Sequence, residues 1–185
     1  MHRMHRRALG LAGLSLLLAA LVPSAGQGQR APRARVGGTW TYDGPAAQGE
    51  AIVRGAVAPI VAGMRPDLQR IAEERIAEST WLPTRIRIGV RPRRIEVALT
   101  GRERRTFASA PAQVLQVPTR HGYAQLTQSV RADGGVQQDF TSLDGTQQNV
   151  YLPGPNSRSM ILDVTLRSPY FPSDIHFQLA YRRGR

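Results

Sequence analysis

Residues 85–100 read RIRIGVRPRRIEVALT, the clearest alternating pattern in the chain. Its apolar residues occupy every second position on both sides of a turn at Arg91–Arg94, a pattern typical of strands that bury one face. We therefore predict two antiparallel strands joined by a tight turn. The alternating positions before and after the turn are Ile86, Ile88, Val90, Ile95, Val97 and Leu99.

The same period of two recurs from here to the end of the chain, with turn residues at roughly ten-residue intervals. Asp133-Gly134 and Asp144-Gly145 are typical hairpin signals. About nine or ten short strands follow from this pattern. Besides the two above, we place strands within 37–42, around Phe107, and at 115–117, 124–130, 136–140, 148–152, 160–166 and 175–181.

These strands predict a mainly β fold, in which neighbours along the chain pair antiparallel as an up-and-down meander. One face is apolar, and the other carries Gln, Thr, Ser and Arg. Closure into a barrel of about 8–10 strands removes exposed edges. We favour this closed or nearly closed barrel over the alternative, an open sheet whose apolar face is covered by helices.

Between the first two strands, at residues 46–79, the apolar period changes to that of a helix pair. Ile52, Ala56 and Ile60 lie four apart on one face of the first helix, which Pro59 is predicted to kink. Pro66 suits the first turn of the second helix. We expect this insert either to cap one end of a barrel as a lid or to pack on an open sheet.

The first 26 residues have the three parts of a secretory signal peptide. Arginines near the start precede an apolar run at Ala8–Val22, and small residues follow it. We predict cleavage near Ala25 or Gly26, with Gly28 as the alternative site. An uncleaved anchor is the other interpretation of this segment.

Residues 27–36 carry three arginines and little apolar content, so we predict a short disordered linker. Residues 37–185 then form a single domain. We expect the chain to be exported to the periplasm or the extracellular space, without a transmembrane span once the signal is cleaved. Because the chain has no cysteine, it is not expected to be a lipoprotein.

All 25 basic residues are arginine, against 13 acidic residues, and the formal net charge is +12. From residue 37 onward, 19 arginines and 13 acids leave a charge of +6. The absence of lysine indicates a coding bias rather than selection for phosphate contacts, and export also argues against a nucleic-acid partner. The lack of cysteine excludes disulfides, thiolate metal sites and a cysteine nucleophile.

The sequence contains no familiar catalytic, phosphate-binding or dinucleotide-binding motif. His121 and His176 lack carboxylates at the spacing of metal ligands. The acidic residues Glu73, Glu74 and Glu78 are predicted to form a helix surface. We therefore expect no enzyme activity, no metal and no cofactor, and an enzyme with a sparse site is the least favoured alternative.

The Gly38-x-Trp40 pair, the meander and the Tyr181-Arg182 end together resemble the lipocalin-like, calycin-type β-barrels. The helix pair after the first strand is similar to intracellular fatty-acid-binding proteins. The resemblance covers most of residues 37–183 as an order of elements. It implies that Gly38, Trp40 and Arg182 are structural residues, with Trp40 at the closed end of the barrel and Arg182 across it.

Fatty-acid-binding proteins usually carry Arg-x-Tyr on the last strand, where the motif holds the ligand carboxylate. Here Leu179-x-Tyr181 stands in its place, so that anchor is missing. The expected inner face instead places amides among apolar side chains, which favours a polar or amphipathic ligand, or bound water. Alternatively, the faces are inverted there. The candidate cavity residues are Gln128, Gln138, Gln148, Phe140, Phe177 and Tyr181.

The sequence thus predicts an exported, non-enzymatic protein that binds a small lipophilic or amphipathic ligand inside a barrel. The alternative is a structural or interaction protein of the cell envelope. In that interpretation, arginine-rich turns contact anionic surface polymers or lipids through charge-assisted hydrogen bonds. The arginines concerned are Arg91, Arg93, Arg94, Arg102, Arg104 and Arg105.

Overall fold

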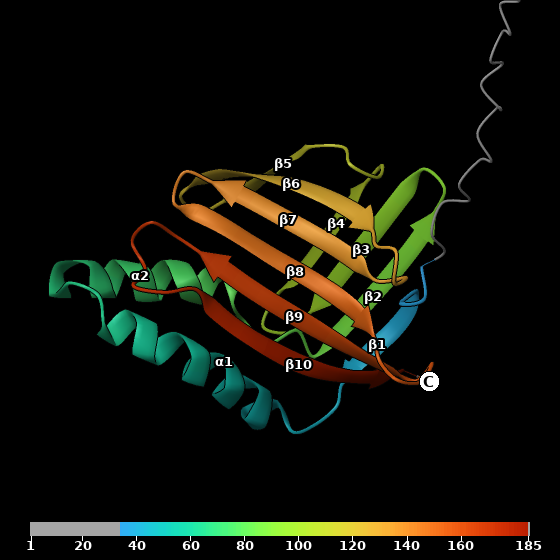
Figure 1. The fold of residues 1–185 in the computed structure, drawn as a ribbon, viewed down its shortest axis with the longest axis horizontal. Coiled ribbons are helices and arrows are strands. Elements are labelled where there is room, and N and C mark those ends of the chain that lie inside the picture. Colours follow the sequence, from blue (N-terminus) through green and yellow to red (C-terminus); the bar gives the residue numbers. More distant parts are fainter. Residues whose placement is uncertain (1–33, 185) are drawn as a thin grey trace, which may run out of the picture. The chain divides into compact units, whose positions relative to one another are not determined.

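The computed structural model describes residues 34–184, which form ten strands and two helices (Figure 1). The predicted signal peptide lies outside these residues. In chain order the elements are β1 (Gly38–Tyr42), α1 (Ala46–Ala62), α2 (Pro66–Ser79), β2 (Arg85–Arg91), β3 (Arg94–Thr100), β4 (Arg104–Ser109), β5 (Leu115–Thr119), β6 (Gly122–Val130), β7 (Val136–Ser142), β8 (Gly145–Pro153), β9 (Ser159–Arg167) and β10 (Ile175–Arg183).

All ten strands belong to one antiparallel sheet with the order β4-β3-β2-β1-β10-β9-β8-β7-β6-β5. The first and last strands of the chain, β1 and β10, pair with each other in the middle of this order and join all ten strands into one sheet. This sheet curls into a nearly closed barrel. Its two edges, β4 and β5, do not pair and leave a seam. The predicted meander of about 8–10 strands, with a helix pair after the first strand, is confirmed.

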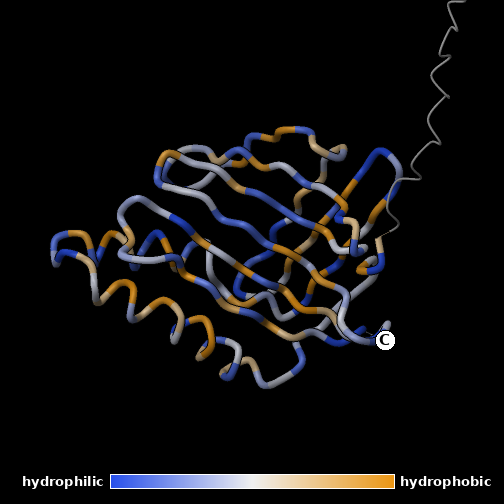
Figure 2. Tube along the Cα trace, viewed as in Figure 1, coloured by the Kyte–Doolittle hydropathy of each residue, from blue (hydrophilic) through white to orange (hydrophobic). Residues whose placement is uncertain are grey.

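Burial alternates along the strands, as the sequence pattern requires. In β10, Ile175, Phe177, Leu179 and Tyr181 are buried, while the residues between them are exposed. The same alternation gives the changing colours along the strands in Figure 2. β10 therefore contributes one apolar face to the interior of the barrel.

Both predicted hairpin turns are present, between β6 and β7 and between β7 and β8. In the first, the Gly135 N–H donates to Asp133 Oδ1 over 2.8 Å, and this hydrogen bond lowers the pKa of the Asp133 carboxyl group. In the second, Gly145 has a φ of 145°, and an added Cβ would lie 2.1 Å from the Arg167 carbonyl oxygen. Only glycine fits this second turn.

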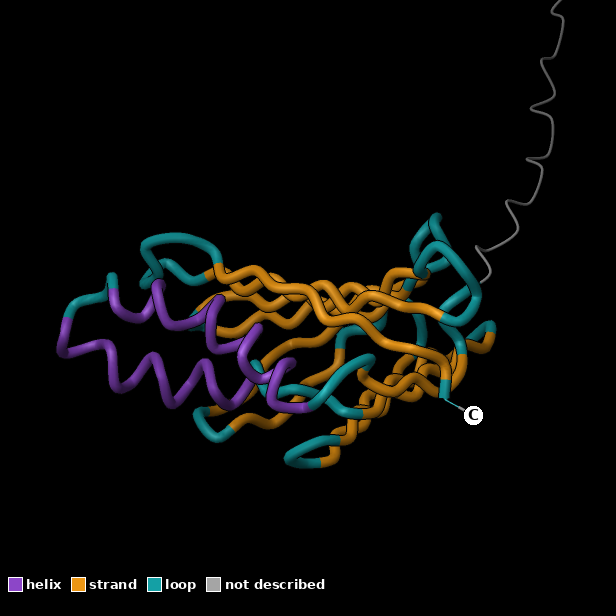
Figure 3. The backbone as a smooth tube through the Cα atoms, turned by 90° about the horizontal axis from the view of Figure 1, so that it is seen from below, coloured by secondary structure: helices purple, strands orange, loops and turns teal. Residues whose placement is uncertain are grey.

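The two helices lie at one end of the barrel, where β9 ends and β10 begins (Figures 1 and 3). Helix α1 runs beside β10. Pro59, the residue predicted to kink it, lies inside the helix, which continues to Ala62. Helix α2 starts with Pro66 in its first turn and buries Ala72 and Ile76. Neither helix in residues 34–184 is long and apolar enough to span a lipid bilayer.

Trp40 lies at the closed end of the barrel, opposite the helices. Its side chain is 1% exposed, and Nε1–H donates to the Val36 carbonyl over 2.8 Å. The guanidinium carbon of Arg183 lies 5.1 Å from the Trp40 ring centroid, which is within cation–π distance. Gly38 has a φ of 130°, in the region that favours glycine, so this position needs a residue without a side chain.

The prediction that Arg182 covers Trp40 is wrong by one residue. Trp40 pairs with Arg183 in the β1–β10 ladder, and directly paired residues share a face of the sheet. Arg182 pairs with Thr41 on the other face, and its Nε lies 3.7 Å from Asp43 Oδ1.

The folded part begins earlier than predicted. Val36 is fully buried, and the Arg35 N–H donates to the Gly134 carbonyl over 2.7 Å. Residues 35 and 36 of the predicted linker are therefore packed against the barrel. The linker residues before Ala34 lie outside the described residues.

Candidate functional site

Side chains fill only one half of the barrel. The end that holds Trp40 is packed with large residues that are less than 2% exposed, among them Ile86, Ile95, Leu126, Met160 and Tyr181. Tyr181 lies edge-on to Tyr42, with ring centroids 5.8 Å apart, and its hydroxyl donates to the Pro83 carbonyl over 2.7 Å. Burial raises the pKa of Tyr181.

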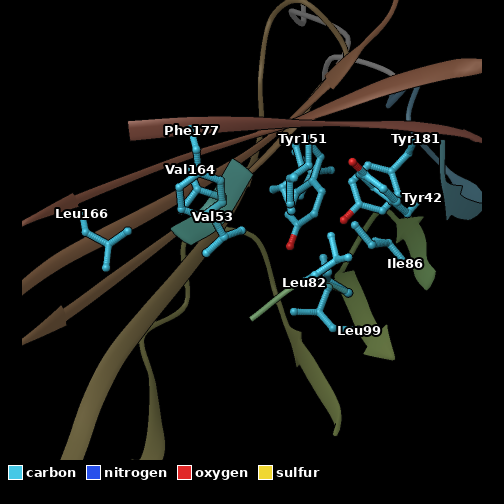
Figure 4. Close-up of a cluster of buried hydrophobic side chains, with 14 of the residues drawn as sticks. Tyr42, Val53, Leu82, Ile86, Leu99, Tyr151, Val164, Leu166, Phe177 and Tyr181 are labelled. Atoms are coloured by element: carbon cyan, nitrogen blue, oxygen red, sulfur yellow. The ribbon is translucent and has the colours of Figure 1, made fainter. Parts of the chain in front are cut away.

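The other half contains a cavity of about 1230 Å³ that is widely open to solvent beside the C-terminal part of α2. This volume exceeds the ~300–1,000 Å³ typical of small-molecule sites. Figure 4 shows Phe177, Val164 and Leu166 on one side of Tyr151, and Tyr181 with Tyr42 on the other. Strands β3 to β10 all contribute to the walls, which include the apolar side chains of Leu99, Phe107, Leu115, Phe140, Leu162, Val164, Leu166, Phe177 and Leu179.

Two of the aromatic residues predicted for the cavity line it. Phe140 lies edge-on to Phe107 with ring centroids 5.4 Å apart, a contact that joins β7 to β4 across the seam. Phe177 lines the wall formed by β10. Tyr181 is buried below the cavity and is not part of its lining. Contact between these residues and a ligand stays a prediction.

The three glutamines do not share one face. Gln128 and Gln138 are fully buried, and Gln138 Nε2 donates to Gln128 Oε1 over 2.8 Å. Gln148 lies on the outer face of β8, where its Nε2 donates to Asp139 Oδ1 over 2.8 Å. In the ladder, Gln138 pairs with Asn149, which takes the inner position.

The predicted inner position of Gln148 is therefore wrong. The sequence assigned Val150 and Leu152 to the interior because they are the hydrophobic residues of this strand. The pairing with β7 and β9 instead turns three other residues of β8 inward, two of them amides. These inner residues are Gln147, Asn149 and Tyr151.

A chain of hydrogen bonds begins at Tyr151, its one member in the lining of the cavity, and runs through buried side chains behind that lining; we call this chain the floor. The Tyr151 hydroxyl donates to Gln138 Oε1 over 2.8 Å, and Gln138 donates to Gln128 as described above. Gln128 Nε2 then donates to Ser109 Oγ over 2.9 Å and to the Ile95 carbonyl over 3.3 Å. The chain links β8, β7 and β6 to β4 and β3, and so it holds the seam together below the cavity.

Tyr151 stays neutral in this arrangement. Burial raises the pKa of its phenol, and the Asn149 side chain opposes the rise only in part. The floor of the cavity therefore presents an uncharged hydroxyl group and amides, and no group poised to transfer a proton near neutral pH.

Charged side chains gather at the mouth of the cavity, where they fasten α2 to the turns of the barrel. Arg75 pairs with Asp144 in the β7–β8 turn. Glu78 lies 3.6 Å from Arg120 Nε and 3.7 Å from His121 Nε2, both in the β5–β6 turn. Helix α2 is thus tied to two turns by ion pairs.

We expect α2 to open more readily than the barrel unfolds. It buries only Ala72 and Ile76, and exposed ion pairs contribute ~0–1 kcal/mol each. The amide of Ile76 should exchange hydrogen with a lower protection free energy than those of Val97 and Val164. Hydrogen exchange followed by NMR measures this difference. Equal protection at the three sites would make α2 a part of the core rather than a lid.

The two arginine clusters lie at opposite ends of the barrel. In the second cluster, the Arg102 and Arg105 guanidinium groups each donate to a backbone carbonyl of α2 over 3.1 Å. In the first, Arg94 pairs with Glu96, whereas Arg91 and Arg93 make no ion pair within residues 34–184. Contact between these two arginines and an anionic envelope component stays a prediction.

The two histidines of this part of the chain lie at different places in the barrel. His121 lies at the mouth beside Glu78, and His176 Nε2 lies 3.0 Å from Asp163 Oδ1 on the outer face of β9 and β10. Gln178 Nε2 also donates to Asp163, over 2.6 Å. In the described part of the chain, no three His, Cys, Asp or Glu side chains gather closely enough to hold a metal ion.

Comparison with solved structures confirms the calycin-type fold that the sequence resembles. A secretory abundant heat soluble protein from Ramazzottius varieornatus matches with a TM-score of 0.52 and 8% identity, over 82% of this chain and 96% of that one. A Schistosoma mansoni fatty-acid-binding protein in complex with arachidonic acid matches with a TM-score of 0.51 and 10% identity, over 82% and 97% of the two chains. At this identity the likeness concerns the fold. No family model and no curated protein sequence matches the chain.

Proposed function

We propose that this protein is an exported, non-enzymatic binding protein that holds a small lipophilic or amphipathic ligand in the barrel cavity. The observation that carries the proposal is the half-empty interior. Protein interiors are normally close-packed, and a small barrel can be filled completely by its own side chains. Here Tyr151 lines an open cavity of about 1230 Å³ whose walls are mostly apolar.

The walls suit a hydrocarbon chain. Burial of each CH₂ group contributes ~0.8 kcal/mol, so a ten-carbon chain gains ~8 kcal/mol. This gain is offset by the loss of translational and rotational freedom on binding, which makes micromolar affinity a reasonable expectation. The similar barrel of the Schistosoma mansoni protein, solved with arachidonic acid, supports the idea that this fold accommodates such a chain.

Two sequence features support the remaining parts of the proposal. The basic, apolar and small-residue parts of residues 1–26 favour export. The lack of a catalytic motif favours a binding role, and the neutral Tyr151 at the floor agrees with it. Neither feature points to nucleic acid as a partner.

Filling the cavity should abolish binding without unfolding the barrel. Val164 lines the cavity, so Val164→Phe places a larger side chain against its open volume. We expect the affinity for Nile red, an uncharged lipophilic dye, to fall at least tenfold, as measured by the dye's fluorescence. Thr165→Phe on the outer face of the same strand is the matched control and should bind like the wild type. Equal binding by Val164→Phe, or no binding by the wild type, would contradict the proposal.

A further inference from the structure

We infer that the cavity selects a ligand with an uncharged polar head group, such as a carboxamide, an ester or an alcohol, over a carboxylate of the same chain length. This inference rests on the proposed function, because it names the ligand class for the same cavity. It follows from two properties of the interior: the fixed polarity of its hydrogen bonds and the position of its charges.

The donor and acceptor roles in this chain of hydrogen bonds are fixed at its Gln128 end. The backbone carbonyl of Ile95 can only accept, so the Gln128 group 3.3 Å from it must be the amide nitrogen. Gln128 Oε1 therefore faces Gln138, which must present its nitrogen, and Gln138 Oε1 is left for Tyr151. The Tyr151 proton is committed to this bond. A carboxylate in the cavity consequently finds no free phenol proton.

Hydrogen bonds also fix the orientation of the Gln147 amide on β8, close to α2. Gln147 Nε2 donates to the Ser79 carbonyl over 3.4 Å and to Asn149 Oδ1 over 2.9 Å. Both hydrogens of this amide are then used, and Gln147 Oε1 remains as an acceptor. Because the Asn149 oxygen accepts from Gln147, the Asn149 nitrogen is the part of this side chain that remains as a donor.

Asn149 is the polar side chain that a ligand meets deepest in the cavity. It is 6% exposed and lines the cavity, and its oxygen accepts from Gln147. Within residues 34–184, no fully buried side-chain nitrogen or oxygen lacks a partner, and Asn149 Nδ2 makes no hydrogen bond to the protein there, so this amide nitrogen is reached from the open space. The interior thus offers one amide donor from Asn149 and one amide acceptor from Gln147.

No positive charge accompanies this pair. The charged side chains that line the cavity lie at its mouth, where Arg105 is 34% exposed and lies 2.9 Å from Glu103. On the last strand, where an anchoring arginine could stand, the inner residue is Leu179. Burying an ionised carboxylate against neutral amides carries a large desolvation cost. A carboxamide has the same shape, carries no charge, and both donates and accepts.

The experiment compares decanamide with decanoate at pH 8, where decanoate is ionised. The two ligands differ only in the terminal group, and each is titrated against bound Nile red. We expect decanamide to bind at least tenfold more tightly. Asn149→Leu should weaken decanamide binding about three- to tenfold, the effect of one hydrogen bond, and leave decanoate within about twofold.

Two further variants keep the test decisive. Gln147→Leu removes the acceptor and should also weaken decanamide binding, which covers the case in which Asn149→Leu does not fold. Gln148→Leu, an amide on the outer face of the same strand, is the control and should bind both ligands like the wild type. Retained binding of Nile red shows that each variant is folded.

Equal or tighter binding of decanoate by the wild type would overturn the inference, and so would decanamide binding that neither inner variant weakens. In both cases bound Nile red would leave the proposed function standing. If none of the three compounds binds, the inference and the proposed function fall together.

Discussion

Trp40→Ala is expected to destabilise the domain by ~3–5 kcal/mol, the usual cost of truncating a large buried aromatic side chain. Trp40 is 1% exposed, donates to the Val36 carbonyl and lies under the Arg183 guanidinium group. Its loss opens the closed end of the barrel and removes both contacts. For a domain of this size, calorimetry should show a melting temperature lower by roughly 6–20 °C.

A pair of arginine variants serves as the internal control for this end of the barrel. Arg183→Gln removes the group that covers Trp40 and donates to the Gly37 carbonyl over 2.6 Å, so it should lower the melting temperature measurably. Arg182→Gln removes only an exposed pairing with Asp43 and should change stability by less than ~1 kcal/mol. An unchanged melting curve for Trp40→Ala would contradict the assignment of Trp40 to the core.

Gln138→Leu is the second substitution with a large expected effect. Leucine has about the same size as glutamine, but it leaves the Tyr151 hydroxyl and Gln128 Oε1 without their partner inside the barrel. Each buried polar group without a partner costs ~1–3 kcal/mol, so we expect a loss of ~2–6 kcal/mol in urea unfolding. Because this chain also bridges the seam, cooperativity of unfolding should fall as well.

Gln148→Leu is the matched control for this substitution. It changes the same residue type on the neighbouring strand, but on the outer face, where Gln148 is only partly buried. We expect it to change stability by less than ~1 kcal/mol. If Gln138→Leu were equally mild, the hydrogen-bonded floor would not stabilise the barrel as described.

The order of strands and helices could be predicted because each element buries one face. A strand with a buried face must alternate, as β10 does from Ile175 to Tyr181, and a helix with a buried stripe must repeat about every four residues. Hairpin turns with Asp-Gly gave the strand boundaries a second, independent signal. These signals are local, so they can be read without knowing the partner strand.

Two errors were one-residue shifts in a pattern with a period of two. Arg182 and Arg183 are identical neighbours, and only the ladder with β1 determines which of them lies over Trp40. In β8, Gln147 and Gln148 are likewise identical neighbours, and hydrophobicity favoured the wrong face because the inner residues there are polar. A one-residue shift moves every side chain to the opposite face, and the local composition of such a strand does not show which face is buried.

The cavity and its floor lie beyond what a sequence pattern can show. Whether a barrel is filled depends on how side chains from all strands meet, and the hollow begins only above Tyr151. The bond between Gln128 and Ser109 joins strands on opposite sides of the seam. The burial of Val36 depends in the same way on distant partners, which is why its local composition suggested a linker.

Native mass spectrometry of the full chain, purified without detergent from the cells that produce it, shows whether the cavity carries a ligand. We expect a complex of one protein with one lipophilic molecule, which collisional activation releases and which Val164→Phe does not retain. The contradicting result is a wild-type protein that shows only its own mass, both as purified and after incubation with decanamide or Nile red.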